Sequence, residues 1–236
     1  MEKIIGINPV MEVLDNKEKN IEKIEIFQGL REDKINIIKR KASERNIRVQ
    51  FIKKKVDNSQ GVVAYINSYD YYVDINEFLE KAALKDKGII LVLDGVQDPR
   101  NFGALIRSAE IFGVLGIVIP ERNSVHINET VVKTSTGAIE YVDIVKVTNI
   151  TDTLNSLKKL GYWIYGAEGD GAKVYYEEKY PEKTVVVLGS EGFGIRKKVK
   201  ENCDILIKIP MHGKINSLNV SVAGGILLSE VAKSIY

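Results

Sequence analysis

The chain has 236 residues, of which 44% are hydrophobic and 28% are charged, and its formal net charge at pH 7 is +2. This length and composition allow a substantial hydrophobic core in one large or two small domains. No apolar run approaches 18 residues, the opening segment lacks the features of a signal peptide, and Cys203 is the single cysteine, so we expect no membrane span, no internal disulfide and a cytoplasmic location.

The first 70 residues are predicted to form a small α/β unit. Its expected elements are a helix from Asn8 to about Leu14, a strand over Lys23–Phe27, a helix over Asp33–Arg45 and strands over Arg48–Ile52 and Val62–Ile66. The segment from Asn67 to Val73 is then a connection. Asp74 and Glu77 form a capping box for a helix that ends near Leu84, which places the boundary between two domains near residue 70.

A basic tract lies within this unit. Between Lys39 and Lys55 there are eight basic residues and one acidic residue, Glu44. Such a density suits a nucleic-acid backbone, although a lysine-rich helix face is often only solvated. The candidate RNA-binding residues are Lys39, Arg40, Lys41, Lys53, Lys54 and Lys55.

The second part of the chain opens with a strand that is predicted to be buried on both faces. Five consecutive aliphatic residues follow Gly88, which is the pattern of an inner strand of a parallel sheet. Asp98 is then a helix N-cap and Pro99 a first-turn proline. On this helix Arg107 lies one turn after Gly103, so its side chain is expected to reach back over the glycine toward Asn101.

Two later segments repeat this plan of a strand, a glycine-rich or polar loop and a helix. The strand Thr184–Gly189 leads into the turn SEGFGIR, which contains Glu191 and is followed by a short basic helix from about Ile195. The strand Ile205–Pro210 leads into a loop and a last helix from about Leu218. The residues of this helix that are expected to face inward are Val222, Ala223, Ile226, Leu227 and Val231. Ser217 and Asn219 suit helix caps, and they also suit the polar edge of a ligand, because helix starts receive anions and polar groups.

Strands that alternate with helices predict an α/β domain with a parallel sheet, and ligands bind such sheets at the carboxyl ends of the strands. Other candidate sites are weaker. The loop Gly166–Glu178 has G-x-x-G-x-G spacing, which supports a dinucleotide site only weakly, and His126 and His212 have no partners at catalytic spacing. We expect no metal site.

The three segments together resemble the signature motifs of the SpoU (TrmH) family of RNA ribose 2′-O-methyltransferases. The motifs are N-x-G-x-x-x-R at Asn101, G-S-E-G-x-G at Gly189 and I-P-M-x-G-x-x-x-S-L-N-V-S-V-A at Ile209. Pattern alone predicts an ordinary doubly wound sheet, whereas the resemblance implies that residues 71–236 form a SPOUT-type domain with a deep trefoil knot. Residues 1–70 resemble the L30e-like substrate-binding domain of some family members, with Ser59 where a histidine is common.

The resemblance also implies a cofactor and site residues. S-adenosylmethionine would be the methyl donor, and the residues implied at its site are Leu188, Gly189, Ile209, Met211, Ser217, Leu218 and Asn219. The implied catalytic residues are Arg107, Asn101, Glu191 and Asn219. Because a guanidinium is a poor base at neutral pH, we expect Arg107 to bind the neighbouring phosphate and to stabilise the developing alkoxide. The sequence leaves two candidates for the group that accepts the proton, a phosphate and a deprotonated Arg107.

The substrate and the assembly follow from the same resemblance. The combination of the two domains is most similar to the family's 23S rRNA guanosine 2′-O-methyltransferases. A tRNA guanosine enzyme and a non-catalytic RNA-binding or resistance factor are the alternatives. The family implies a homodimer formed through the carboxyl-terminal domain.

Overall fold

The computed structural model describes residues 2–16, 20–53, 61–67, 71–214 and 217–236. The chain divides into two compact units, Met1–Asp70 and Tyr71–Tyr236. Lys54 and Lys55 of the basic tract, together with Ser59, lie outside the described residues.

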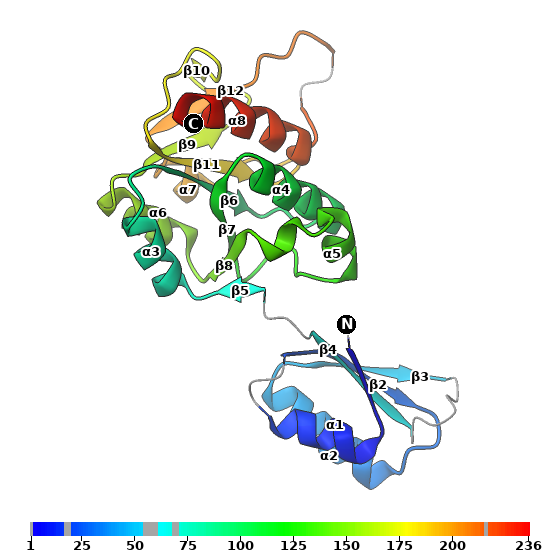
Figure 1. The fold of residues 1–236 in the computed structure, drawn as a ribbon. Helices are drawn as coiled ribbons and strands as arrows, with labels where there is room; N and C mark the ends of the chain where they lie inside the picture. Colours follow the sequence, from blue (N-terminus) through cyan, green and yellow to red (C-terminus); the bar gives the residue numbers. More distant parts are fainter. Residues whose placement is uncertain (1, 17–19, 54–60, 68–70, 215–216) are drawn as a thin grey trace. The chain divides into compact units, whose positions relative to one another are not determined.

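The first unit is a four-stranded sheet with two helices packed on one face (Figure 1). Its strand order is β1-β4-β2-β3, in which β2 and β3 are parallel and the other pairs antiparallel. The elements are β1 (Glu2–Ile5), α1 (Ile7–Asp15), β2 (Asn20–Phe27), α2 (Glu32–Glu44), β3 (Arg48–Ile52) and β4 (Val62–Asn67). Strand β1 was not predicted, because its four residues carry no clear alternation; it forms through its pairing with β4.

The second unit is an α/β domain built on a sheet of eight strands in the order β10-β12-β9-β11-β6-β7-β8-β5. Every described strand pair in it is parallel, which confirms the predicted sheet type. Its strands are β5 (Tyr72–Val73), β6 (Gly88–Asp94), β7 (Val114–Pro120), β8 (Asp143–Val147), β9 (Trp163–Ala167), β10 (Lys173–Val174), β11 (Lys183–Gly189) and β12 (Ile205–Lys208).

Helices cover both faces of this sheet (Figure 1). The helices are α3 (Ile75–Ala83), α4 (Pro99–Ile111), α5 (Glu129–Ser135), the 3₁₀ turn η1 (Ala138–Glu140), α6 (Ile150–Lys159), α7 (Lys197–Lys200) and α8 (Val220–Ile235). Alternate residues of β6 enter different cores: Leu91 packs with α4 and α8, whereas Val92 packs with α3 and α6. Burial on both faces explains the unbroken aliphatic runs in the sequence.

The predicted helix starts are formed as the capping chemistry requires. The side chain of Asp74 accepts hydrogen bonds from the backbone amides of Asn76 and Glu77, and α3 begins after it. The side chain of Asp98 accepts from the amides of Arg100 and Asn101 at the start of α4. These caps satisfy amides that have no partner within the helix.

One expectation about the carboxyl-terminal segments is confirmed and another was wrong. The short basic helix predicted from about Ile195 is α7, which has four residues and begins at Lys197. Val222 was expected to face inward on the last helix, but it is 50% exposed, and Gly224 and Leu228 are buried in its place. The helix begins at Val220, two residues later than expected, and its buried residues are Val220, Gly224, Leu227, Leu228, Val231 and Ile235.

Helix α8 packs closely against α4, and the two adjacent glycines in it test this packing. A Cβ at Gly224 would lie 2.4 Å from Cδ2 of Leu105 and 3.0 Å from Cδ1 of Leu188, whereas a Cβ at Gly225 would lie 3.7 Å from the nearest atom, Oγ of Ser108. We predict that Gly224→Ala lowers the free energy of unfolding by about 1–3 kcal/mol through overpacking. Gly225→Ala, the matched control, should leave it unchanged or raise it by up to about 1 kcal/mol through helix propensity. Urea unfolding of both variants measures the difference; equal stabilities would contradict the close docking of α8.

Candidate functional site

Two pockets lie at the carboxyl-terminal edge of the parallel sheet, and the last residues of four strands line them. The first pocket is lined by Asp94 of β6 and Pro120 of β7, and the second by Ala167 of β9 and Gly189 of β11. The strands β6 and β11 pair in register up to Asp94 and Gly189, which brings their following loops together. This is the edge at which parallel α/β sheets bind ligands.

Three polar side chains from the three motif segments meet between the pockets. The amide nitrogen Nδ2 of Asn101 donates to Oε1 of Glu191 at 2.8 Å. Nδ2 of Asn219 donates to Oδ1 of Asn101 at 3.0 Å and to Oε1 of Glu191 at 3.2 Å. We call Asn101, Glu191 and Asn219 the polar cluster; the structure brings together residues that are up to 118 positions apart in the sequence.

Asn219 also starts helix α8. Its Oδ1 accepts hydrogen bonds from the backbone amide of Ser221 at 2.9 Å and from the Ser221 hydroxyl at 2.6 Å. The expected cap is therefore present, and the same side chain uses its donor toward the polar cluster. The helix start and the cluster are fixed by one residue.

Glycines shape the turn that carries Glu191. The backbone of Ser190 and Gly194 exchanges two hydrogen bonds of 3.1 and 3.0 Å. Gly192 and Gly194 have φ angles of 91° and 66°, in the left-handed region that favours glycine. At Gly189 a Cβ would lie 2.0 Å from the carbonyl carbon of Gly194, so only glycine fits there.

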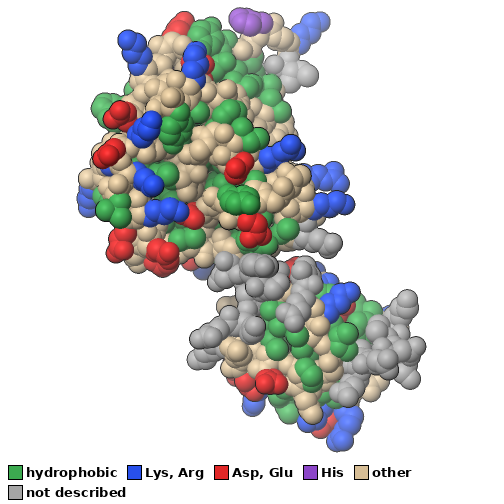
Figure 2. Space-filling model, in the orientation of Figure 1, with side chains coloured by type: hydrophobic (Ala, Val, Ile, Leu, Met, Phe, Trp, Pro, Cys, Tyr) green, Lys and Arg blue, Asp and Glu red, His purple; other side chains and the backbone are tan. Residues whose placement is uncertain are grey.

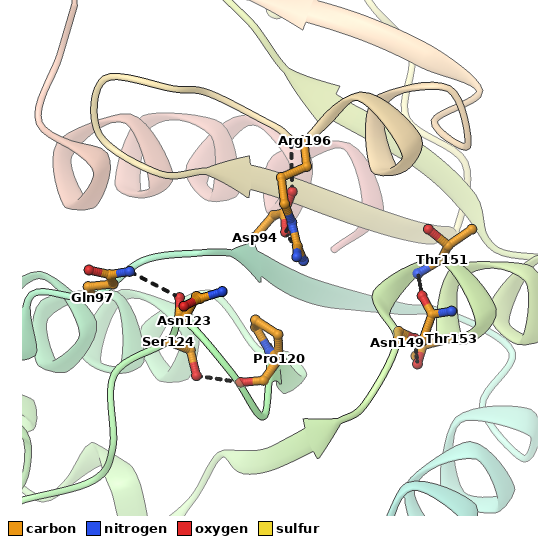
Figure 3. A network of polar contacts seen from close by, with 9 residues as sticks. All are labelled: Asp94, Gln97, Pro120, Asn123, Ser124, Asn149, Thr151, Thr153 and Arg196. Atoms are coloured by element: carbon orange, nitrogen blue, oxygen red, sulfur yellow. Dashed lines mark hydrogen bonds and ion pairs between the residues drawn. The ribbon is translucent and has the colours of Figure 1, made fainter.

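Two carboxylates that were not predicted, on the partly buried Glu168 and the fully buried Asp94, fix the end of this turn. Oε1 of Glu168 accepts from the backbone amide of Ile195 at 2.7 Å. The fully buried side chain of Asp94 accepts from the amide of Arg196 at 2.8 Å and from its guanidinium Nε at 2.6 Å (Figure 3). Two features of the sequence could have indicated these residues. Asp94 is a carboxylate at the end of a buried strand, and Glu168 lies in the loop Gly166–Glu178, which was considered only as a dinucleotide motif.

The second pocket has an acidic and partly apolar lining. Its volume is about 730 Å³, within the range of small-molecule sites. Its charged lining residues are Glu168 and Glu191, and no lysine or arginine from the described part of the chain lines it. Of the predicted cofactor residues, this pocket contains Leu188, Gly189, Ser217, Leu218 and Asn219.

Ile209 and Met211, which were also predicted at the cofactor, do not line this pocket among the described residues. Ile209 packs against the larger hydrophobic core, and Met211 is 38% exposed in the loop that follows β12. Their assignment rested on motif position alone.

The first pocket has a different charge. Its volume is about 600 Å³, and it is lined by Arg122 and Arg196 in addition to three acidic residues. Phe193 and Glu191 line both pockets. The polar cluster therefore lies where an acidic pocket meets one that contains arginines.

Arg107 lies on the exposed side of α4 and lines neither pocket. It makes no hydrogen bond or ion pair with any residue that the structure describes. The glycine that was expected to make room for it serves another contact, since a Cβ at Gly103 would lie 2.6 Å from Cβ of Thr134 in α5. Gly103 is thus a packing residue between α4 and α5.

The described residues of the basic tract have different surroundings. Lys39 and Lys53 are exposed, and Nζ of Lys39 lies 4.7 Å from the centre of the Phe51 ring. Arg40 is exposed, with Nε 4.0 Å from Glu44 Oε1. Lys41 is mostly covered and forms an ion pair with Asp15. Lys41 therefore contributes to holding α1 against α2.

Other reactive groups do not contribute to the site. Burial raises the pKa of the Cys203 thiol to about 12, so it stays protonated at neutral pH and is not a nucleophile. No group of three potential metal ligands was found in the parts of the chain described. None of the helices within those parts has the length and hydrophobicity of a membrane span. On the face shown in Figure 2 acidic and basic side chains are interspersed over the second unit, so charge alone does not mark a binding surface.

Comparisons with known proteins agree with this organisation. Residues 88–229 match the profile of the SpoU rRNA methylase family, and residues 3–72 match that of the substrate-binding domain of RNA 2′-O ribose methyltransferases. A Staphylococcus haemolyticus protein named as a TrmH family tRNA/rRNA methyltransferase is 42% identical over 97% of this chain and 94% of its own length.

Solved structures show the same fold. An AdoMet-bound rRNA methyltransferase from Sinorhizobium meliloti superposes with a TM-score of 0.64 at 22% identity, over 99% of this chain and 87% of the other. A TrmH family RNA methyltransferase from Porphyromonas gingivalis superposes with a TM-score of 0.60 at 27% identity, over 97% and 88%.

Proposed function

Because the chain belongs to the SpoU family of RNA methylases, we propose that it transfers the methyl group of S-adenosylmethionine to the 2′-hydroxyl of a ribose in RNA. The observation that carries this proposal is the polar cluster of Asn101, Glu191 and Asn219 between two pockets of different charge. A methyl transfer needs the donor and the acceptor on opposite sides of the moving group. The two pockets supply two such sides.

The acidic pocket fits the cofactor. S-adenosylmethionine is a sulfonium cation at its reactive centre and supplies an electrophilic methyl group. Glu191 gives the pocket a carboxylate that forms no ion pair with the described residues, whereas Glu168 is paired with Nζ of Lys200 at 3.4 Å. No basic residue of the described chain lines the pocket, and Leu188, Val220 and Ala223 give it apolar surface. We assign the cofactor to this pocket, held by Leu188, Gly189, Ser217, Leu218 and Asn219.

Glu191 is the residue best placed to orient the acceptor. Its Oε1 is held by the amides of Asn101 and Asn219, whereas Oε2 receives no hydrogen bond from the described residues. Oε2 is therefore the atom that we assign to accept the hydrogen bond of the ribose 2′-hydroxyl. Two charge-assisted hydrogen bonds hold the carboxylate in one orientation before the substrate arrives, which is the preorganisation that catalysis requires.

Arg107 is proposed to bind a phosphate beside the acceptor. Its exposure and lack of described partners leave all of its donors available. Because it lines neither pocket in the single chain, we assign it to the RNA backbone near the reacting atoms, where its charge would stabilise the alkoxide that develops.

The proposed domain is knotted and dimeric. Strand β12 lies near one edge of the sheet, yet the chain after it returns to pack α8 on α4, β6 and β11 in the middle, which supports threading of the last segment (Figure 1). The apolar side chains of Ile111 and Val222 are 62% and 50% exposed on α4 and α8, which supports a second copy packing there.

The proposed substrate is a guanosine in 23S rRNA, with a tRNA guanosine as the second candidate. The first unit supports an RNA substrate, since it matches a family of substrate-binding domains. We propose that its exposed Lys39, Arg40 and Lys53, together with Lys54 and Lys55, contact the RNA backbone.

Transfer from labelled S-adenosylmethionine to undermethylated 23S rRNA and to tRNA tests the reaction. We expect one labelled nucleotide whose ribose resists alkaline cleavage on its 3′ side. A methyl group on a base, or no transfer to either RNA, would contradict the reaction, and transfer to tRNA alone would contradict the substrate. Calorimetric binding of S-adenosylmethionine without turnover would favour a non-catalytic RNA-binding factor.

Arg107→Ala is predicted to lower the single-turnover rate about 10²- to 10³-fold at saturating RNA, because an electrostatic stabiliser is lost. Binding of S-adenosylmethionine and the melting temperature should not change, since Arg107 is exposed and lies outside the cofactor pocket. Arg107→Lys should restore little activity, because an ammonium lacks the planar fork that binds phosphate. Transfer by Arg107→Ala at the wild-type rate would make Arg107 an ordinary surface residue.

A further inference from the structure

We infer that the pocket containing Arg122 binds the acceptor nucleotide, with the ring of Phe193 stacked on its base and Arg122 bound to its phosphate. This inference rests on the proposed function and specifies how the acceptor is held. The pocket has a volume of about 600 Å³ and shares Glu191 with the cofactor pocket. A nucleotide in it would have its ribose beside the polar cluster.

Phe193 is 94% exposed, the highest value among the exposed large hydrophobic residues of the described chain. It contributes nothing to the core, and its position is nevertheless constrained. The turn that carries it is closed by the two backbone hydrogen bonds between Ser190 and Gly194, and Glu168 and Asp94 hold its end through the amides of Ile195 and Arg196. An exposed aromatic ring on a fixed turn is a platform on which a nucleic-acid base can stack.

The charges of this pocket favour a phosphate at Arg122. The carboxylate of Asp94 is paired with Arg196, and Oδ1 of Asp98 accepts from two helix amides. Arg122 is exposed and forms no ion pair or hydrogen bond with the residues that the structure describes. Its guanidinium is therefore the cation of the pocket that is left for a ligand, and its planar fork suits phosphate.

The loop around Arg122 is held in place on both sides (Figure 3). The side chain of Gln97 donates to the carbonyl of Asn123 at 3.5 Å, and the Ser124 hydroxyl donates to the carbonyl of Pro120. The amide of Val125 donates to the carbonyl of Val96 at 3.0 Å. These bonds join the loop after β7 to the loop after β6, so that Arg122 and Asn101 line the same pocket.

A cycle with an abasic acceptor separates stacking from other roles of Phe193. The probe is a synthetic RNA fragment that contains the nucleotide mapped in the transfer assay, together with the same fragment lacking the base but keeping the ribose at that nucleotide. For the wild type, removal of the base should lower kcat/KM about 10- to 100-fold, the range for loss of one aromatic stack. Phe193→Ala should lose a similar factor on the intact fragment and little more on the abasic one, while Phe193→Tyr should retain activity.

The matched control is Tyr141→Ala, which removes an aromatic side chain that is 80% exposed and lines neither pocket. Its kcat/KM should equal that of the wild type. Calorimetry with S-adenosylmethionine alone should show unchanged affinity for Phe193→Ala. Weaker cofactor binding with normal kcat/KM at saturating cofactor would place Phe193 on the cofactor and overturn the inference. The inference would also be overturned if Phe193→Ala lowered kcat/KM on the abasic fragment by the same factor as on the intact fragment.

Arg122 is tested by its salt dependence. Arg122→Ala should raise the KM for the intact fragment and leave the affinity for the cofactor unchanged. It should also reduce the slope of log KM against log salt concentration by about one unit, the change expected for one lost phosphate contact. An unchanged slope would overturn the role of Arg122. If the wild type methylates the 2′-hydroxyl and Phe193→Ala does so at the same rate, this inference alone is rejected. If the wild type transfers no methyl group, the proposed function is rejected and this inference with it.

Discussion

The arrangement of the site depends on the hydrogen bonds of the Asn219 side-chain amide. Its nitrogen donates to Asn101 at the start of α4 and to Glu191 in the turn after β11, and its oxygen caps α8. One side chain thus joins three segments that are distant in sequence. Each of them must be in place for the hydrogen bonds to form: β6 and β11 in register, the glycine turn closed, and α8 packed on α4 through Gly224.

The polar cluster also divides the site by charge. On one side Glu168 and Glu191 line a pocket that suits a cation, and on the other Arg122 lies in a pocket that suits a phosphate. Such a division matches a reaction between a sulfonium donor and a polyanionic acceptor, because arginines line the first pocket and no basic residue of the described chain lines the second. The ion pair between the buried Asp94 and the exposed Arg196 supports this division, since it neutralises a carboxylate that would otherwise repel the acceptor.

The local features of this fold were predictable from the sequence because they depend on local chemistry. The aliphatic strands β6 and β11 and the caps at Asp74, Asp98 and Asn219 were predicted and are present. The predictions that were wrong concern features that depend on tertiary packing. Gly103 was assigned to Arg107, but α5 occupies its face, and Val222 was placed inward, although α8 presents Gly224 to Leu105. The importance of Glu168 and Arg122 depends on which loops meet, which spacing alone does not encode.

We propose that methyl transfer needs the donor amide of Asn219 as well as its helix cap. Asn219→Asp separates these roles, because aspartate keeps an oxygen to accept from Ser221 but replaces the donor with a second oxygen facing Glu191 and Asn101. The decisive measurement is the single-turnover rate of methyl transfer by this variant at saturating cofactor and RNA, beside its melting temperature. We expect a rate lowered about 10²- to 10³-fold in a protein that remains folded. A wild-type rate from Asn219→Asp would show that the polar cluster does not organise the reaction.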